Sequence, residues 1–148
     1  MFSYQILSQP TSFVIDEARI ASIFEYIAKV VSVPQKGVLN IAFLSDVEIQ
    51  SFNKAYRGID KTTDVLSFHY FEDFSSISKD EVAGEIIMSE SRIQEQSVEH
   101  AHSLLSEFEI LAIHGILHIL GYDHEDEEDY EEMWKIERPI RDYFGLKL

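Results

Sequence analysis

Hydrophobic residues recur along this chain with two periodicities, one typical of helices and one typical of strands. The helical spacing predicts helices over residues 15–31, 47–56, 89–100, 108–120 and from about 125 onward. Short apolar or alternating runs predict strands over residues 2–7, 38–44, 65–71 and 82–88. We therefore expect an α+β fold, in which a mixed sheet of about four strands packs with about five helices.

Capping residues and a proline predict where two of these helices begin or bend. Ser106 and Glu109 have the spacing of a capping box for the helix that ends near residue 120, and a start near Ser103 is the alternative. Pro139 is expected to kink or restart the last helix, because proline lacks the N–H that continues the ladder.

The composition is that of one ordinary globular domain, which we expect to span residues 1–148. The chain has 45% hydrophobic residues and no cysteine. Its first residues lack the basic start and long apolar core of a signal peptide. No stretch approaches the roughly 18 apolar residues of a membrane span. We therefore expect a cytoplasmic protein that does not enter a membrane.

Acidic residues outnumber basic ones by 27 to 12, which gives a formal net charge of −15 at pH 7. Proteins that grip the phosphates of nucleic acids usually carry a basic surface. Tight, unaided binding to long RNA is therefore not expected.

The most informative motif contains three histidines. His114 and His118 are four residues apart, so on a helix both rings face one side and can reach one ion. Gly121 favours the end of that helix, and the reversing chain can bring His124 to the same ion. Three imidazoles with an open fourth position are typical of catalytic zinc. Closure by a fourth His, Asp or Glu is the alternative, and nickel, cobalt or iron also suit these ligands.

The alternative interpretation is that these histidines lie near one another by chance. The predicted helix over residues 108–120 is apolar nearly all round, which is typical of a buried central helix. Burying two imidazoles costs a few kcal/mol unless something satisfies them, and a shared metal ion would do so. We therefore expect a metal site at the end of a buried central helix.

One position separates this motif from that of the metzincin peptidases, H-E-x-x-H-x-x-G-x-x-H. Gly115 stands where those enzymes have the glutamate that takes a proton from the metal-bound water. Peptidase activity by the usual route is therefore not expected, whereas hydrolysis of another bond is open to a metal that lowers the pKa of its water to about 7.

Arg57 is the candidate catalytic residue upstream of the histidines. Its planar, permanently charged guanidinium is suited to bidentate binding of phosphate oxygens. The turn from Gly58 to Asp60 is expected to release it from the preceding helix. A surface or salt-bridging arginine is the alternative.

Three further histidines receive no firm role. His69 lies near the end of a predicted strand and either lines a cleft or makes an ordinary hydrogen bond. His100 and His102 are two positions apart, which on a helix does not bring their rings together.

Three blocks of the sequence resemble, in order, the YbeY family of bacterial metal-dependent endoribonucleases. The first block contains Tyr56 and Arg57 and ends in the run Thr-Asp-Val-Leu-Ser-Phe over residues 63–68. The second is Gly-Glu-Ile over residues 84–86, where the family usually has Gly-Asp-Ile, and the third is the histidine motif. The match runs from about residue 41 to the end of the chain.

The resemblance implies an endoribonuclease that hydrolyses RNA phosphodiester bonds of a single-strand type in 16S ribosomal RNA maturation and ribosome quality control. It implies that His114, His118 and His124 hold one zinc ion and that Arg57 is important for activity. From its chemistry we expect Arg57 to stabilise charge in the transition state. Implied partners are ribosomal RNA or the small ribosomal subunit, with a ribosome-associated protein, and no nucleotide cofactor.

The general base and two rival functions stay open. Asp123, Glu125 and a metal-bound hydroxide are all compatible with the sequence as the base. The first rival is a peptidase or amidase that uses the same histidines, and it needs a substitute base and a free sheet edge for an extended peptide. The second is a non-catalytic ribosome-assembly factor whose metal ties down the C-terminal half, which four protein ligands would indicate.

Overall fold

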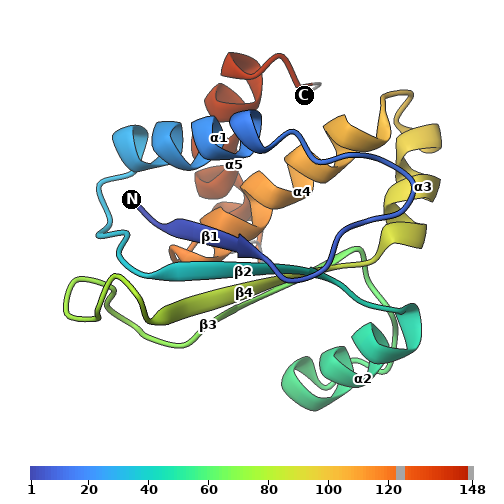
Figure 1. Cartoon of the computed structure of the whole chain (residues 1–148), viewed down its shortest axis with the longest axis horizontal. Helices are drawn as coiled ribbons and strands as arrows, with labels where there is room; N and C mark the ends of the chain where they lie inside the picture. Colours follow the sequence, from blue (N-terminus) through green and yellow to red (C-terminus); the bar gives the residue numbers. More distant parts are fainter. Residues whose placement is uncertain (123–125, 147–148) are drawn as a thin grey trace.

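The computed structural model describes residues 1–122 and 126–146 (Figure 1). The elements follow the order β1 (Ser3–Ile6), α1 (Glu17–Val30), β2 (Val38–Phe43), α2 (Asp46–Arg57), β3 (Val65–His69), β4 (Val82–Met88), α3 (Glu90–Glu99), α4 (Leu104–Ile119) and α5 (Glu127–Tyr143). The expected α+β class, with five helices and four strands in the described residues, is confirmed. None of these helices is long and apolar enough to cross a membrane.

The four strands form one mixed sheet in the order β1-β2-β4-β3. The first three strands in this order are parallel to one another, and β3 runs antiparallel to β4. Strand β3 is therefore an edge strand, and its outer side has no partner within the described part of the chain.

Helices cover both faces of this sheet (Figure 1). Helices α1, α4 and α5 lie on one face, and the main hydrophobic core fills the space between them and the sheet. Helix α2 lies on the other face over a smaller cluster of Ile49, Leu66 and Ile87. From residue 107 to residue 119 of α4, every side chain is buried except those of His114 and His118, which are half-buried. The expected buried central helix is confirmed.

The structure corrects the expected start of α4 and the expected break in α5. The N-cap of α4 is Ser103, whose hydroxyl accepts from the backbone N–H of Ser106, so the capping box from Ser106 to Glu109 is wrong and the alternative start near Ser103 is confirmed. Glu109 is instead buried and binds Arg19 of α1 through N–H···O bonds of 2.9 and 3.0 Å. Helix α5 runs without a break through Pro139, so the expected restart there is also wrong.

Candidate metal centre and cleft

Helix α4 ends in a Schellman motif directly after the second histidine. The N–H of Gly121 donates to the carbonyl of His118 at 3.0 Å, and the N–H of Tyr122 donates to that of Leu117 at 3.1 Å. Gly121 has φ 104°, a conformation that suits glycine because it has no Cβ. The prediction that Gly121 stops the helix and turns the chain is confirmed.

The structure brings His114 and His118 together at this helix end. Their ring centroids lie 4.9 Å apart, and the ring planes are tilted by 57°. Both side chains are half-buried and line the same cleft, so both rings can reach one ion there. His124, the third expected ligand, and Asp123 and Glu125, the candidate bases, lie outside the described residues, so their roles stay predictions.

A buried carboxylate holds His114 in place. Oε1 of Glu137 lies 2.9 Å from Nδ1 of His114, and Arg141 donates to Oε2 of Glu137 at 3.3 Å. Because a carboxylate only accepts hydrogen bonds, Nδ1 of His114 donates this one, and Nε2 is the ring nitrogen left to bind a metal. A carboxylate behind a histidine is the arrangement that orients metal ligands. The two imidazoles therefore fit a zinc-type ion.

Sequence reasoning missed Glu137, although a signal was present. Met133, Glu137 and Ile140 are the buried residues of α5, and they follow the spacing of one helix face. A glutamate in an apolar stripe needs a polar partner inside the protein. The pattern alone does not say that the partner is His114.

Gly115 faces the sheet and not the histidines' cleft. A Cβ added at this position would lie 3.1 Å from Cγ2 of Ile86 in β4. A glutamate there would enter the packed layer between α4 and the sheet, so this position cannot provide a base in this fold.

A cleft of about 1000 Å³ opens beside the histidines. It lies between the edge strand β3, the end of α2 and the helices α3, α4 and α5. Polar and charged side chains from all of these elements line it, including Arg57, Asp64, His69, Gln96, His100, Glu107, His114, His118, Glu137 and Arg141. The structure thus places Arg57 and two of the expected metal ligands around one space.

Arg57 is the last residue of α2, so the expectation that the following turn frees it from the helix is wrong. Gly58 caps the helix after it with φ 71°, and its N–H donates to the carbonyl of Lys54 at 3.1 Å. Arg57 is exposed and forms no side-chain hydrogen bond or ion pair with another described residue. Its guanidinium is therefore available to a ligand in the cleft.

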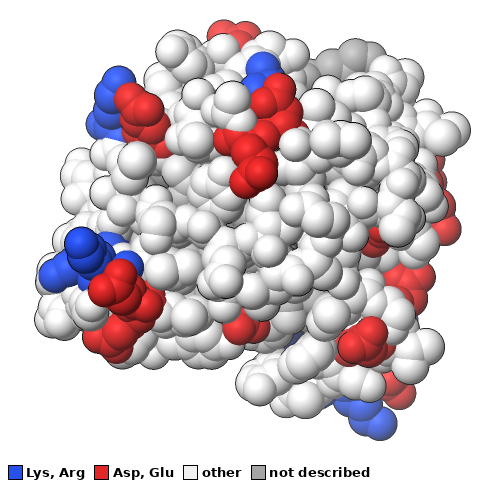
Figure 2. All heavy atoms as spheres, in the orientation of Figure 1, with Lys and Arg blue, Asp and Glu red and all other residues white. Residues whose placement is uncertain are grey.

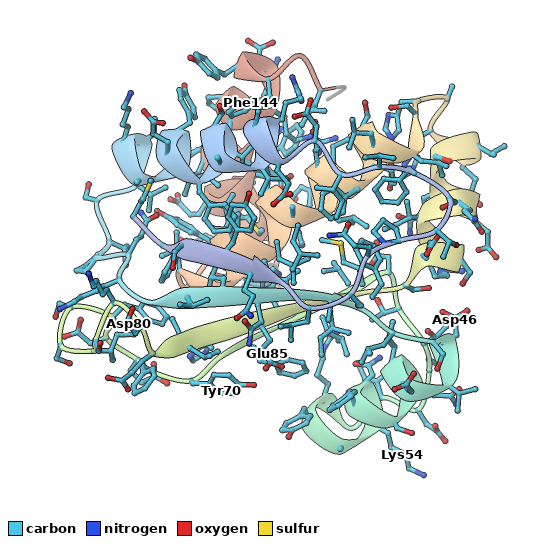
Figure 3. All side chains as sticks on the ribbon, in the orientation of Figure 1. Asp46, Lys54, Tyr70, Asp80, Glu85 and Phe144 are labelled. Atoms are coloured by element: carbon cyan, nitrogen blue, oxygen red, sulfur yellow. The ribbon has the colours of Figure 1, made fainter. Side chains whose placement is uncertain are left out.

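Aromatic side chains form the rim of the cleft beside Arg57. Tyr56 is 69% exposed, and its ring centroid lies 5.0 Å from that of Phe68. Tyr70 is 54% exposed, and burial together with the nearby Glu85 carboxylate raises the pKa of its hydroxyl. Figure 3 shows Glu85 and Tyr70 on the side of the sheet that carries α2. Glu85 therefore lies on the sheet face opposite α4, away from the histidines.

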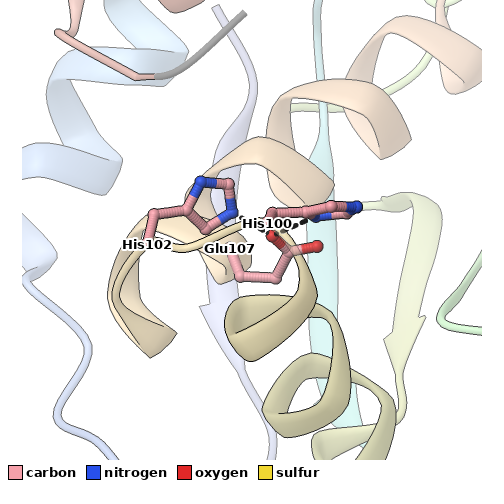
Figure 4. Close-up of side chains that lie close together, drawn as sticks. All are labelled: His100, His102 and Glu107. Atoms are coloured by element: carbon pink, nitrogen blue, oxygen red, sulfur yellow. Dashed lines mark hydrogen bonds and ion pairs between the residues drawn. The ribbon is translucent and has the colours of Figure 1, made fainter.

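His100 and His102 come together, against the expectation from their spacing. Helix α3 ends at Glu99, so the two residues follow the helix and their ring centroids lie 5.5 Å apart. Both rings contact the buried carboxylate of Glu107 (Figure 4). His69 lines the cleft and also has Nδ1 3.2 Å from the carbonyl oxygen of Phe71, so both of its expected environments are present.

The family model described as Endoribonuclease YbeY matches residues 7–145 of this chain. The chain belongs to the YbeY family. The resemblance drawn from the three sequence blocks is thereby confirmed.

Individual relatives agree with this membership. The chain is 37% identical over 134 residues to a protein of Bacillus pumilus named Endoribonuclease YbeY, covering 86% of this chain and 84% of that one. It is 35% identical over 134 residues to the Bacillus subtilis protein of the same name, covering 86% and 85%. A solution structure of a Thermotoga maritima protein is similar with a TM-score of 0.56 and 26% identity, covering 96% of this chain and 91% of that one.

Proposed function

We propose that this protein is an endoribonuclease that hydrolyses phosphodiester bonds in single-stranded regions of RNA, in 16S ribosomal RNA maturation and ribosome quality control. The observation that carries the proposal is membership of the YbeY family over residues 7–145, with relatives named as endoribonucleases. The cleft supports it, because Arg57 and a pair of metal-type histidines line the same space.

In this proposal His114, His118 and His124 hold one divalent ion, with zinc as the expected metal. When bound, such an ion supplies Lewis-acid stabilisation of phosphoryl charge and lowers the pKa of a bound water. Glu137 binds Nδ1 of His114 and so orients the ring with Nε2 as the nitrogen that would bind the ion. Imidazole ligands also accept nickel or cobalt, so the resident metal has to be measured.

Arg57 acts in this proposal on the scissile phosphate. Its guanidinium binds two phosphate oxygens and stabilises the charge that grows on them in the transition state. Its position at the end of α2 supports this role, because Gly58 ends the helix there and Arg57 stays exposed in the cleft.

Base stacking compensates in part for the unfavourable charge. Figure 2 shows acidic side chains scattered over one face of the molecule, with most basic side chains beside an acidic one. A net charge of −15 therefore leaves little general attraction for RNA. The exposed rings of Tyr56 and Tyr70 can stack on unpaired bases at the cleft rim, and such stacking does not depend on protein charge.

Neither rival function is favoured. A peptidase would find a free strand edge at β3, but the position of its usual base is Gly115, which faces the sheet. The carboxylates of Asp64, Glu107 and Glu137 line the cleft, and each is already bound by other side chains.

The domain organisation, cellular location and partner of the protein are also proposals. We propose that the chain works as one domain, in the cytoplasm, on ribosomal RNA within or beside the small subunit. A ribosome-associated protein partner would supply the affinity that an acidic surface lacks.

Cleavage of ribosomal RNA tests the proposal. Metal-quantified protein is incubated with precursor 16S RNA, free and in assembled subunits, and the products are mapped. We expect cleavage at defined positions by the wild-type protein, loss of cleavage in His114→Ala, and a fall of about 100-fold or more in Arg57→Ala.

Two matched variants control this experiment. Arg138→Ala removes the same charge from an exposed position on α5 that does not line the cleft, so near wild-type cleavage is expected. Arg57→Lys keeps the charge and loses the bidentate geometry, so its rate should lie between those of wild type and Arg57→Ala. Cleavage that persists unchanged in His114→Ala would point to a contaminating nuclease and contradict the proposal.

A further inference from the structure

A second cluster of metal-type side chains lies beside the same cleft. His100, His102 and Glu107 each offer one ligand atom, and these three atoms lie within 4.8 Å of one another (Figure 4). His100 and Glu107 line the cleft, as do His114 and His118. No role was assigned to these three residues from the sequence.

The side chains converge on a single point. Nδ1 of His100 lies 3.2 Å from Oε2 of Glu107, and Nε2 of His102 contacts the same oxygen atom. A tetrahedral zinc ion needs ligand atoms about 3.3 Å apart, given bonds of about 2.0–2.1 Å. Two imidazoles and one carboxylate also form a known ligand set of catalytic zinc, with a fourth position left open.

Burial favours a partner for this carboxylate. The Glu107 side chain is 2% exposed and that of His102 is 9% exposed, whereas that of His100 is 53% exposed. A buried carboxylate needs compensating positive charge or hydrogen bonds. Among the described residues its side-chain partners are the two imidazoles, and an ion bound by the three groups would supply compensating positive charge.

The backbone is shaped to bring the two histidines together. Helix α3 ends in a Schellman motif, in which Ala101 donates to Val98 at 3.2 Å and His102 donates to Ser97 at 3.1 Å. Ala101 has φ 54° and is the one residue other than glycine with positive φ in the described chain. This left-handed step reverses the chain between His100 and His102, so both rings reach Glu107.

We propose that His100, His102 and Glu107 bind a divalent transition-metal ion of the zinc class, separate from the ion assigned to His114 and His118. Glu107 and His114 are seven residues apart on α4, which is about 10 Å along the helix axis. The two ions are therefore too far apart for a two-metal site, which needs about 3.5–4 Å.

An ion bound here would be accessible from the cleft, because His100 and Glu107 line it. Resting on the proposed function, an RNA phosphate is the ligand that would take its fourth position. The ion would then add positive charge to the cleft of an acidic protein.

Zinc binding without RNA tests the inference. Metal-free protein is titrated with Zn²⁺ against a competing chelator, and bound zinc per chain is counted by mass spectrometry under native conditions. We expect two bound ions in the wild-type protein, one in His100→Ala and one in His118→Ala. In His100→Ala, the zinc affinity of the remaining pair, His102 and Glu107, should fall at least about 100-fold. His69→Ala removes another cleft histidine and should still bind two.

The variants separate this inference from the proposed function. His100 is largely exposed, so His100→Ala should fold, and circular dichroism verifies that it does. Loss of one zinc ion in His100→Ala supports the second site, whatever the result for His118→Ala. If His118→Ala still binds two zinc ions, the metal ligands assigned in the proposed function are wrong. Unchanged zinc stoichiometry and affinity in His100→Ala overturns the second site and leaves the proposed function standing.

Discussion

Glu137 on α5 accepts a hydrogen bond of 2.9 Å from Nδ1 of His114 on α4. The contact joins residues 23 positions apart, and His114 and Glu137 both line the cleft. Arg141, one turn further along α5, binds the second oxygen of the same carboxylate. Helix α5 therefore acts as the support of the candidate metal centre.

Replacing this carboxylate should weaken metal binding without removing a ligand. We expect Glu137→Gln to lower zinc affinity by about 10–100-fold, because an amide orients the imidazole less well and makes it a weaker base. Competition with a chelator measures the affinity. Glu132→Gln changes an exposed glutamate of the same helix and should bind zinc like the wild type, whereas equal losses in both variants would contradict the support role.

Gly84 should be intolerant of even a methyl group. A Cβ at this position of β4 would lie 2.4 Å from the carbonyl oxygen of Phe68 in β3, and backbone cannot move aside as a side-chain end does. We expect Gly84→Ala to lower the free energy of unfolding by about 2–3 kcal/mol, measured by urea denaturation.

Gly115→Ala is the matched comparison for this prediction. Its Cβ would meet side-chain atoms of Ile86 at 3.1–3.4 Å, and alanine favours the helix by about 1 kcal/mol. We expect a change within about 1 kcal/mol of wild type. A larger loss in Gly115→Ala than in Gly84→Ala would contradict the packing described for β3 and β4.

The protein should be less stable with alanine at position 101 than with glycine there. An L-residue in the left-handed region costs about 1–2 kcal/mol, and part of this is offset by the greater freedom of glycine in the unfolded chain. We expect Ala101→Gly to raise the free energy of unfolding by about 0.5–1 kcal/mol. Ala55→Gly, in the exposed part of α2, should instead lower it by about 1 kcal/mol, so a loss in both variants would contradict the conformation of Ala101.

Asp46 should make stability depend on pH. Hydrogen bonds from the hydroxyls of Ser89 at 2.5 Å and Ser91 at 2.7 Å hold the pKa of this carboxyl below its usual value, although partial burial raises it. A folded-state pKa below the unfolded value stabilises the protein above about pH 4, and this contribution is lost as pH falls through the folded pKa.

The variant Asp46→Asn should show this dependence. We expect it to lower the free energy of unfolding by about 1 kcal/mol at pH 7 and by progressively less below pH 4, measured by urea denaturation across pH. Asp80→Asn, at an exposed loop position, should have little effect at any pH. A deficit in Asp46→Asn that stays constant from pH 7 to pH 3 would refute the assignment of the lowered pKa.

Local signals explain why much of the fold was predicted from the sequence. The spacing of apolar residues located the four strands, and the nearly uniform hydrophobicity of residues 108–120 identified the central helix. Gly121 marked the end of α4 because its conformation depends on its own residue type. These features need no information from distant parts of the chain.

The features that were missed depend on distant contacts or on an unusual backbone. Glu109 fitted a capping pattern, but its carboxylate binds Arg19, which is 90 positions away. His100 and His102 were expected to diverge on a helix, whereas α3 ends at Glu99 and an alanine takes the left-handed position where glycine is usual. Helical spacing rules apply only within a helix, and His100 and His102 lie beyond the end of α3, so the rules did not predict how close their rings are.

A crystal structure of the zinc-loaded protein, with anomalous scattering recorded at the zinc absorption edge, tests the central claim most directly. The account predicts a peak within about 2.1 Å of Nε2 of His114 and of a nitrogen of both His118 and His124, with a further coordination position occupied by solvent. A fourth protein ligand closing the ion, or no peak between these histidines, would contradict it.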